Sequence, residues 1–283
     1  MSPHALVPFA RAFRSYHGSR RARSLATMLR LIDARAGSCV EVRPARRGLL
    51  RVHADVPAGA DACDVTGLRV LLTADLLVRT AELGELQALA TWAFGARAPE
   101  QAAALECAAD ALGIHPPAVR AGSGGTTAAP ADVRLTGQAA AEDAEDGGQG
   151  GIVVRVGAAR MPGGTEQVAG HDPLAVRLAL LSSGYHQAAG LTEEVLARAR
   201  DTLRRWRRLV AQWAESPSRP VPAPVAAAAR DAFGSLDTVA ALELLRGLAA
   251  DDGVPAGARF EAFVYADRVL GLDLPRDIGR LAG

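Results

Sequence analysis

The chain has 283 residues, of which 49% are hydrophobic and 22% are charged, and its formal net charge is +1. This length suffices for one large domain or two smaller ones, each with its own core. A net charge this close to zero does not by itself indicate a nucleic-acid partner. No apolar run approaches the roughly 20 residues of a transmembrane helix, so we expect no membrane partner.

Arginine and cysteine usage narrow the class of protein further. All 32 basic residues are arginine, and lysine is absent from the sequence. The three cysteines are scattered and form neither a disulfide framework nor a zinc-binding pattern. We therefore expect reduced thiols in a cytoplasmic protein.

The first segment, residues 1–27, is rich in arginine and lacks the apolar core of a secretory signal. It predicts a disordered basic tail, or a stretch that precedes a true start at Met28. The alternative is a basic arm that contacts RNA phosphates.

From Met28 to residue 120 the hydrophobic pattern alternates between strand and helix periods. Alternating or β-branched runs predict short strands at residues 28–32, 40–42, 49–53 and 86–94. Apolar residues at helical spacing predict helices at residues 67–83 and 100–112. Strand, helix and strand in this order favour a βαβ unit of a nucleotide-binding sheet.

Residues 121–150 interrupt this pattern with glycine, alanine and threonine followed by a cluster of acids. Such a composition buries little apolar surface, so we expect a disordered linker. A strand is expected again at residues 152–156, where the sequence is rich in valine.

The remainder, residues 171–283, is predicted to be a helical bundle. Apolar stripes and capping residues predict four helices, beginning near Leu174, Thr192, Asp237 and Pro255. A proline-rich stretch at residues 216–224 is predicted to be a linker between the second and third of them.

Five segments resemble, in order, cysteinyl-tRNA synthetases and the related cysteine ligase of mycothiol synthesis. They are residues 28–35, 109–119, 172–185, 236–245 and 263–273. The resemblance implies an α/β plus α protein: a reduced Rossmann-like half-fold at residues 28–120 and 151–170, then a class I synthetase-like helical domain at 171–283. We expect a degenerate, truncated paralogue, for the reasons that follow.

The zinc site of that family is not preserved in this sequence. Its first metal ligand is a cysteine in a Cys-Gly-Pro turn, which aligns here with Asp55-Val56-Pro57. The other ligands have no counterpart, because the 121–150 segment occupies their place. A lone carboxylate does not make a four-ligand zinc site, so we expect no metal.

Both nucleotide-binding signatures of the family are also altered. The His-Ile-Gly-His signature aligns with Asp64-Val65-Thr66-Gly67, which replaces both histidines and puts an acid where polyphosphate would lie. The Lys-Met-Ser-Lys-Ser signature aligns with residues 160–164, which begin Arg160-Met161 and carry glycine in place of the second lysine. We expect no catalytic residues and no bound ATP.

These observations predict a catalytically inactive cysteinyl-tRNA synthetase-like protein whose helical domain binds tRNA or a protein, such as a working synthetase. Its candidate RNA-binding residues surround Trp206 and are Arg204, Arg205, Arg207 and Arg208. The alternative for this helix is an ordinary amphipathic one, with Trp206 in the core and its arginines in water. Two other functions remain open: an ATP-dependent cysteine or amino-acid ligase with a rebuilt site that uses ATP and zinc, and a remnant without function.

Overall fold

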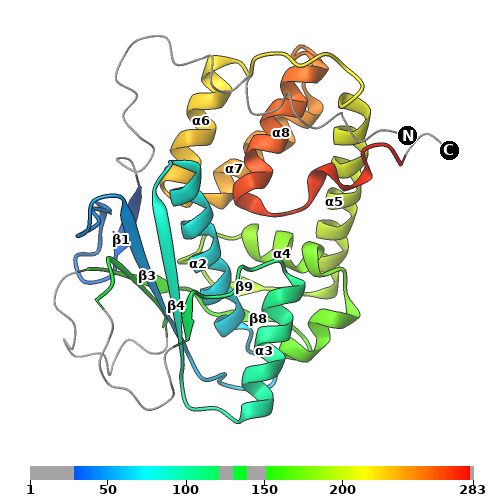
Figure 1. The fold of residues 1–283 in the computed structure, drawn as a ribbon. Helices are drawn as coiled ribbons and strands as arrows, with labels where there is room; N and C mark the ends of the chain where they lie inside the picture. The colour runs from blue at the N-terminus through cyan, green and yellow to red at the C-terminus, as the bar shows by residue number, and fades with distance from the viewer. Residues whose placement is uncertain (1–28, 121–129, 139–150, 281–283) are drawn as a thin grey trace, which may run out of the picture.

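The structure is a computed structural model that describes residues 29–120, 130–138 and 151–280 (Figure 1). The basic tail predicted for residues 1–27 lies outside the described residues, as does most of the segment 121–150. The protein is mixed α/β, with the sheet on one side, helices on the other, and α2 between them.

Five parallel strands form the main sheet. In spatial order they are β5 (Val119–Arg120), β4 (Gln87–Phe94), β3 (Leu49–Val56), β6 (Val133–Gly137) and β7 (Ile152–Val156). Numbered along the chain, this is the order 3-2-1-4-5 of the first five strands in the doubly wound nucleotide-binding fold. The order reverses between β3 and β6, which makes their carboxyl ends the switch point of the sheet.

The prediction of a linker at residues 121–150 is wrong for residues 130–138, the part that the structure describes, because β6 lies there. Val133 and Leu135 are both fully buried, and β6 pairs with β3 on one side and with β7 on the other. Asp132 anchors the start of the strand by accepting hydrogen bonds from the backbone N–H groups of Ala45 and Arg51. A central strand this short needs few apolar side chains, and the surrounding glycine, alanine and acids conceal it in the composition.

The helix predicted at residues 67–83 is confirmed as α2 (Thr66–Leu83). It contacts β3, β4 and β6 on one side and α8 on the other, which explains why it is apolar nearly all round. The helix predicted at residues 100–112 is also confirmed, as α3 (Pro99–Ala111).

A small hairpin and a two-stranded element complete the α/β part. The strands β1 (Arg30–Asp33) and β2 (Ser38–Glu41) are antiparallel and form a hairpin. The hairpin lies against β7 through β1, and the Ala34 N–H donates a hydrogen bond to the Val153 carbonyl of β7. The strands β8 (Ala159–Arg160) and β9 (Ala189–Gly190) are parallel to each other. A 3-10 helix, η3 (Gly164–Gly170), leads into the helical layer.

Five α-helices follow residue 172 in the described part of the chain, rather than the four predicted. They are α4 (Pro173–Leu181), α5 (Glu193–Trp213), α6 (Ala223–Gly234), α7 (Thr238–Ala250) and α8 (Ala256–Leu270), followed by the 3-10 helix η4 (Leu274–Asp277). The additional helix is α6, whose start overlaps the predicted proline-rich linker, because proline is tolerated in the first turn of a helix. The predicted caps Thr192 and Asp237 are confirmed, since each side chain accepts a backbone N–H. None of the helices in the described residues has the length and apolar character to cross a membrane.

Two buried arginines join the sheet layer to the helices. Arg177 of α4 is fully buried and donates to Asp75 of α2 at 2.7 Å and to the carbonyls of Leu112 and Leu270 at 3.0 and 2.6 Å. Arg69 of α2 donates to carbonyls of the 157–158 and 183–187 segments. Burial lowers the pKa of Arg69 to about 10, so its charge persists at neutral pH. Buried apolar residues of both layers belong to one continuous core.

Candidate functional site

The carboxyl ends of β3 and β6 are where an open α/β sheet ordinarily binds its ligand. The positions predicted from the two nucleotide signatures lie at this edge, although about a third of the chain separates them. The Val65 N–H donates to the Ala159 carbonyl at 2.9 Å, and the Met161 N–H donates to the Cys63 carbonyl at 2.9 Å. Asp64 and Arg160 form a backbone bridge. The start of α2 and strand β8 therefore form one surface.

Asp64 occupies the start of α2 with its own carboxylate. One oxygen accepts the Thr66 N–H at 2.8 Å and the other accepts the Ala60 N–H at 2.8 Å. A negative charge here stabilises the helix and repels a bound anion. At roughly 4 Å and an effective dielectric constant of about 20, each unit charge pair opposes binding by about 4 kcal/mol.

Arg160, the cation predicted from the second signature, is already paired. Its guanidinium lies 2.9 Å from the carboxylate of Asp61, and both side chains are largely exposed. The pKa of Asp61 is lowered by the Cys63 N–H and by Arg160. An incoming phosphate would have to compete with Asp61 for the only cation left from this signature.

Side chains of Pro57 and Thr66 crowd the carboxyl end of β6. A Cβ atom built on Gly137 would lie 2.8 Å from Cγ of Pro57 and 3.3 Å from Cγ2 of Thr66. Gly67 likewise permits close packing of α2, since a Cβ there would lie 3.0 Å from Cγ1 of Val56. The charge of Asp64, the pairing of Arg160 and this crowding do not fit a nucleoside triphosphate.

Asp55, at the position of the family's first zinc ligand, lies on β3 and has two other partners. His53 Nε2 lies 2.9 Å from one carboxylate oxygen, and Arg134 Nη1 donates to the other at 2.7 Å. Burial raises the pKa of Asp55, but the bonds from His53 and Arg134 outweigh it and hold the pKa below its ordinary value. In the described ranges, no group of three or more His, Cys, Asp or Glu residues is placed to hold a metal ion. The surroundings of Asp55 do not fit zinc.

The arginines of α5 do not form the single group that the sequence predicted. Arg207 is buried and donates to the Leu272 and Asp273 carbonyls at 2.8 and 3.1 Å, so this prediction is wrong for Arg207. It fails because Arg207 follows the buried Trp206 and lies on the edge of the apolar stripe. The alternative of Trp206 in the core is confirmed by its burial and its edge-to-face contact with Phe263.

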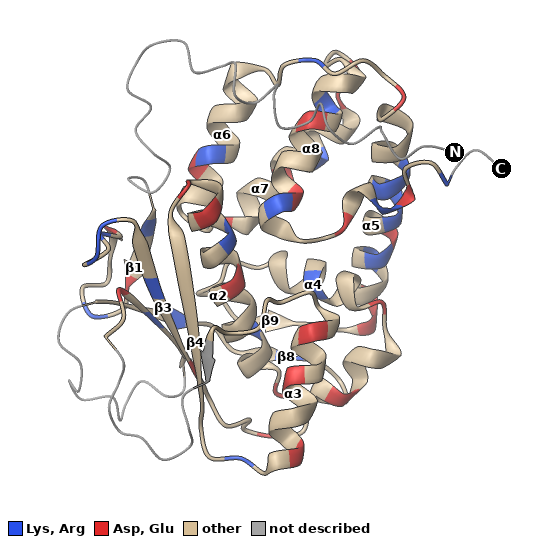
Figure 2. Cartoon of the chain, in the orientation of Figure 1, with Lys and Arg blue, Asp and Glu red and all other residues tan. Residues whose placement is uncertain are grey.

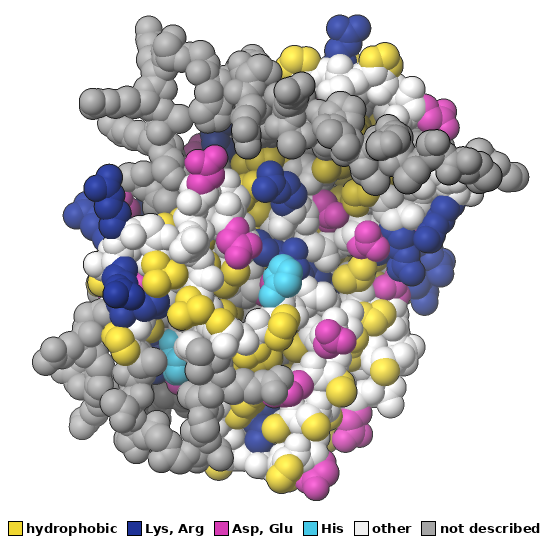
Figure 3. Space-filling model, in the orientation of Figure 1, with side chains coloured by type: hydrophobic (Ala, Val, Ile, Leu, Met, Phe, Trp, Pro, Cys, Tyr) yellow, Lys and Arg dark blue, Asp and Glu magenta, His cyan; other side chains and the backbone are white. Residues whose placement is uncertain are grey.

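Arg204, Arg205 and Arg208 remain exposed on the outer face of α5. Within the described part of the chain, none of the three forms an ion pair. Arg200, one turn before Arg204, is exposed as well and was not predicted. Charges of both signs mark α5 in the ribbon, and arginine side chains gather at this edge of the molecule (Figures 2 and 3).

No protein-family model and no curated protein sequence matches the chain. The resemblance carried by the short segments therefore remains a prediction.

Proposed function

We propose that this protein is a non-catalytic relative of the class I cysteinyl-tRNA synthetases and that it binds RNA through the outer face of α5. One observation carries the proposal: the start of α2 is occupied by the carboxylate of Asp64, while Arg204, Arg205 and Arg208 of α5 are exposed and form no ion pair among the described residues. The first feature disfavours ATP chemistry and the second favours a polyanion.

The strand order and the contact between the two signature positions support a shared ancestry with nucleotide-binding enzymes. Ancestry does not preserve activity, because function depends on the site and not on the fold. Here Asp64 opposes the phosphates and Asp61 neutralises Arg160.

The arrangement on α5 suits RNA phosphates. Arg204 and Arg208 are four residues apart and lie side by side on the helix surface. Arginine presents a planar fork of donors that matches phosphate oxygens. Transfer RNA is the proposed partner because the resembling family acts on it. A protein partner, such as a working synthetase, is the alternative outcome of the test.

The test is filter binding of bulk tRNA at about 50 and about 200 mM salt, since each lost phosphate contact reduces the log–log salt slope by about 0.9. We expect the Arg204→Ala/Arg205→Ala/Arg208→Ala variant to bind more weakly with a flatter slope. Arg246→Ala, which removes an exposed arginine of α7, is the matched control and should bind as the wild type does. Absence of binding at low salt would remove RNA and leave a protein partner. Unchanged binding by the triple variant would place the interface elsewhere.

Catalysis is tested separately. We expect no cysteine-dependent ATP–pyrophosphate exchange. Exchange that Arg160→Ala abolishes would overturn the non-catalytic assignment and favour the ATP-dependent ligase.

A further inference from the structure

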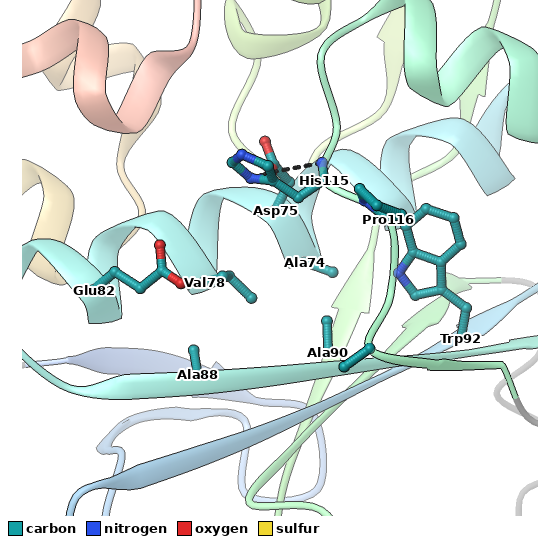
Figure 4. Close-up of a pocket in the computed structure, with 10 residues that line it drawn as sticks. Ala74, Asp75, Val78, Glu82, Ala88, Ala90, Trp92, His115 and Pro116 are labelled. Carbon is teal, nitrogen blue, oxygen red and sulfur yellow. Dashed lines mark hydrogen bonds and ion pairs between the residues drawn. The ribbon is translucent and has the colours of Figure 1, made fainter.

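A cavity of about 180 Å³ lies between α2 and the face of β4 that is turned toward it (Figure 4). It is separate from the carboxyl ends of β3 and β6, where the strand order reverses. It forms beside β5, whose described residues pair with Thr91 and Trp92 of β4. Its walls are mainly apolar, with Ala74 and Val78 on α2 and Ala88 and Ala90 on β4. An apolar cavity of similar size holds a benzene-sized molecule in another protein.

Trp92 brings a hydrogen-bond donor to this cavity. Its side chain is only 3% exposed, and the nitrogen edge of its ring faces the cavity (Figure 4). The indole N–H donates to none of the residues that the structure describes, although the ring has an edge contact with Phe94. Buried tryptophan N–H groups usually have an acceptor. Trp92 Nε1 is not one of the fully buried, unpaired atoms of the described residues, so an acceptor on a ligand would replace solvent at this position.

His115 provides a second polar group on the same wall. Its Nδ1 lies 3.0 Å from Oδ1 of the buried Asp75, and its side chain is 59% exposed at the mouth of the cavity. Asp75 also takes hydrogen bonds from Arg79 and Arg177, so its oxygens are already engaged. Pairing with Asp75 fixes the ring and leaves Nε2 without a partner in the described ranges. Because Nδ1–H donates to the carboxylate, Nε2 of the neutral ring is an acceptor, which suits a hydroxyl or N–H group of a ligand and not its carboxylate.

Glu82 lines the other end of the cavity, toward the end of α2. Its carboxylate disfavours an anion at that end. An acceptor group of a ligand is therefore directed toward Trp92, and its apolar body toward Val78 and Ala88.

We propose that the α2–β4 cavity binds a small carboxylate with an apolar body, one oxygen of which accepts a hydrogen bond from Trp92 Nε1. The cavity is separate from the carboxyl ends of β3 and β6 and from the arginines of α5. The proposal therefore does not depend on RNA binding, and either can fail without the other.

The test uses the full chain and benzoate as the probe, followed through the indole N–H signals of the ¹⁵N-labelled protein. The chain has three tryptophans, and the signal lost in Trp92→Phe identifies Trp92. We expect benzoate to shift this signal saturably at concentrations up to about 10 mM, which would saturate a site with a Kd of about 1 mM. Toluene, which lacks an acceptor, and benzylamine, which is a cation, should bind at least about ten-fold more weakly, a difference of one decade in Kd.

Variants separate binding from folding. Trp92→Phe keeps an aromatic side chain, although a smaller one, and removes the N–H donor. Benzoate affinity, followed by ligand-detected NMR, should therefore fall about ten-fold or more. Glu82→Gln should bind benzoate more tightly, whereas Glu85→Gln, outside the cavity wall, should leave the affinity unchanged. The proposal is overturned if benzoate causes no shift, if toluene or benzylamine binds as well as benzoate, or if Trp92→Phe binds it as tightly as the wild type. A thermal melt of each variant confirms that it is folded.

Discussion

Between the sheet and the helices, Arg69 and Arg177 are buried and donate to fixed acceptors, whereas Arg204, Arg205 and Arg208 extend into solvent from α5. A chain without lysine thus uses one residue type for two purposes. The buried group holds layers of the fold together, and the exposed group is available to a polyanion. Substitution of a buried arginine should therefore lower stability, whereas substitution of the exposed arginines should lower binding and leave stability almost unchanged.

The largest effect is expected at Arg177. Arg177→Ala leaves Asp75 buried without its closest cation and should lower the free energy of unfolding by about 3–5 kcal/mol. Urea denaturation measures this loss. Arg246→Ala, an exposed control, should change the same quantity by less than about 0.5 kcal/mol. A small effect at Arg177 would remove the distinction between the two groups of arginines.

Neighbouring positions on α5 sharpen the comparison. Arg207→Ala leaves the Leu272 and Asp273 carbonyls without their donor and should destabilise the fold by about 1–3 kcal/mol. Arg208→Ala should have almost no effect on stability. Thermal unfolding of the two variants compares them directly, and equal losses would contradict the burial assigned to Arg207.

Acid should reduce the stability that the buried arginines contribute through Asp75, and it should not affect the exposed arginines of α5. Burial raises the pKa of Asp75, but the bond from His115 and the charges of Arg177 and Arg79 outweigh it and hold the pKa well below its ordinary range. The stability that this depressed pKa contributes is complete above about pH 4 and is lost as the pH falls toward the folded-state pKa. The unfolding free energy should therefore fall with decreasing pH more steeply in the wild type than in Asp75→Asn, by up to about 1.4 kcal/mol per pH unit. Urea titrations between about pH 4 and pH 2 measure both slopes, and parallel curves would contradict the assignment.

The smallest stability effect is expected for the exposed arginines. Arg204→Ala/Arg205→Ala/Arg208→Ala should change the unfolding free energy by no more than about 0.5 kcal/mol at each site, while tRNA affinity falls. The measurement is urea denaturation of the same samples used for filter binding. A large loss of stability would mean that these side chains also hold the fold together.

Periodicity was sufficient to predict the elements whose pattern is carried by many apolar residues, such as α2 and β4. It was insufficient for β6, where two buried side chains and pairing on both sides define the strand. For α6, the prolines were interpreted as a linker although they occupy the start of an alanine-rich helix. Pairing and packing from distant parts of the chain decided both cases.

The candidate sites show the same limit. The sequence does contain a signal for the burial of Arg207. This residue lies four positions after Leu203 and three before Val210, on the apolar side of the helix. The α2–β4 cavity had none. It depends on the packing of α2 against β4 and on the orientation of one indole ring, and neither follows from local sequence.

The bonds of Arg177 constrain how such a protein can evolve. Its side chain bonds to α2, to the end of α3 and to the end of α8, so the helices after residue 171 depend on residues in the first half of the chain. Deletion of the sheet would remove partners that the helices require. A lineage that lost its chemistry and was selected for its helical surface would still inherit the sheet intact. A doubly wound strand order is therefore by itself no sign that a nucleotide is bound.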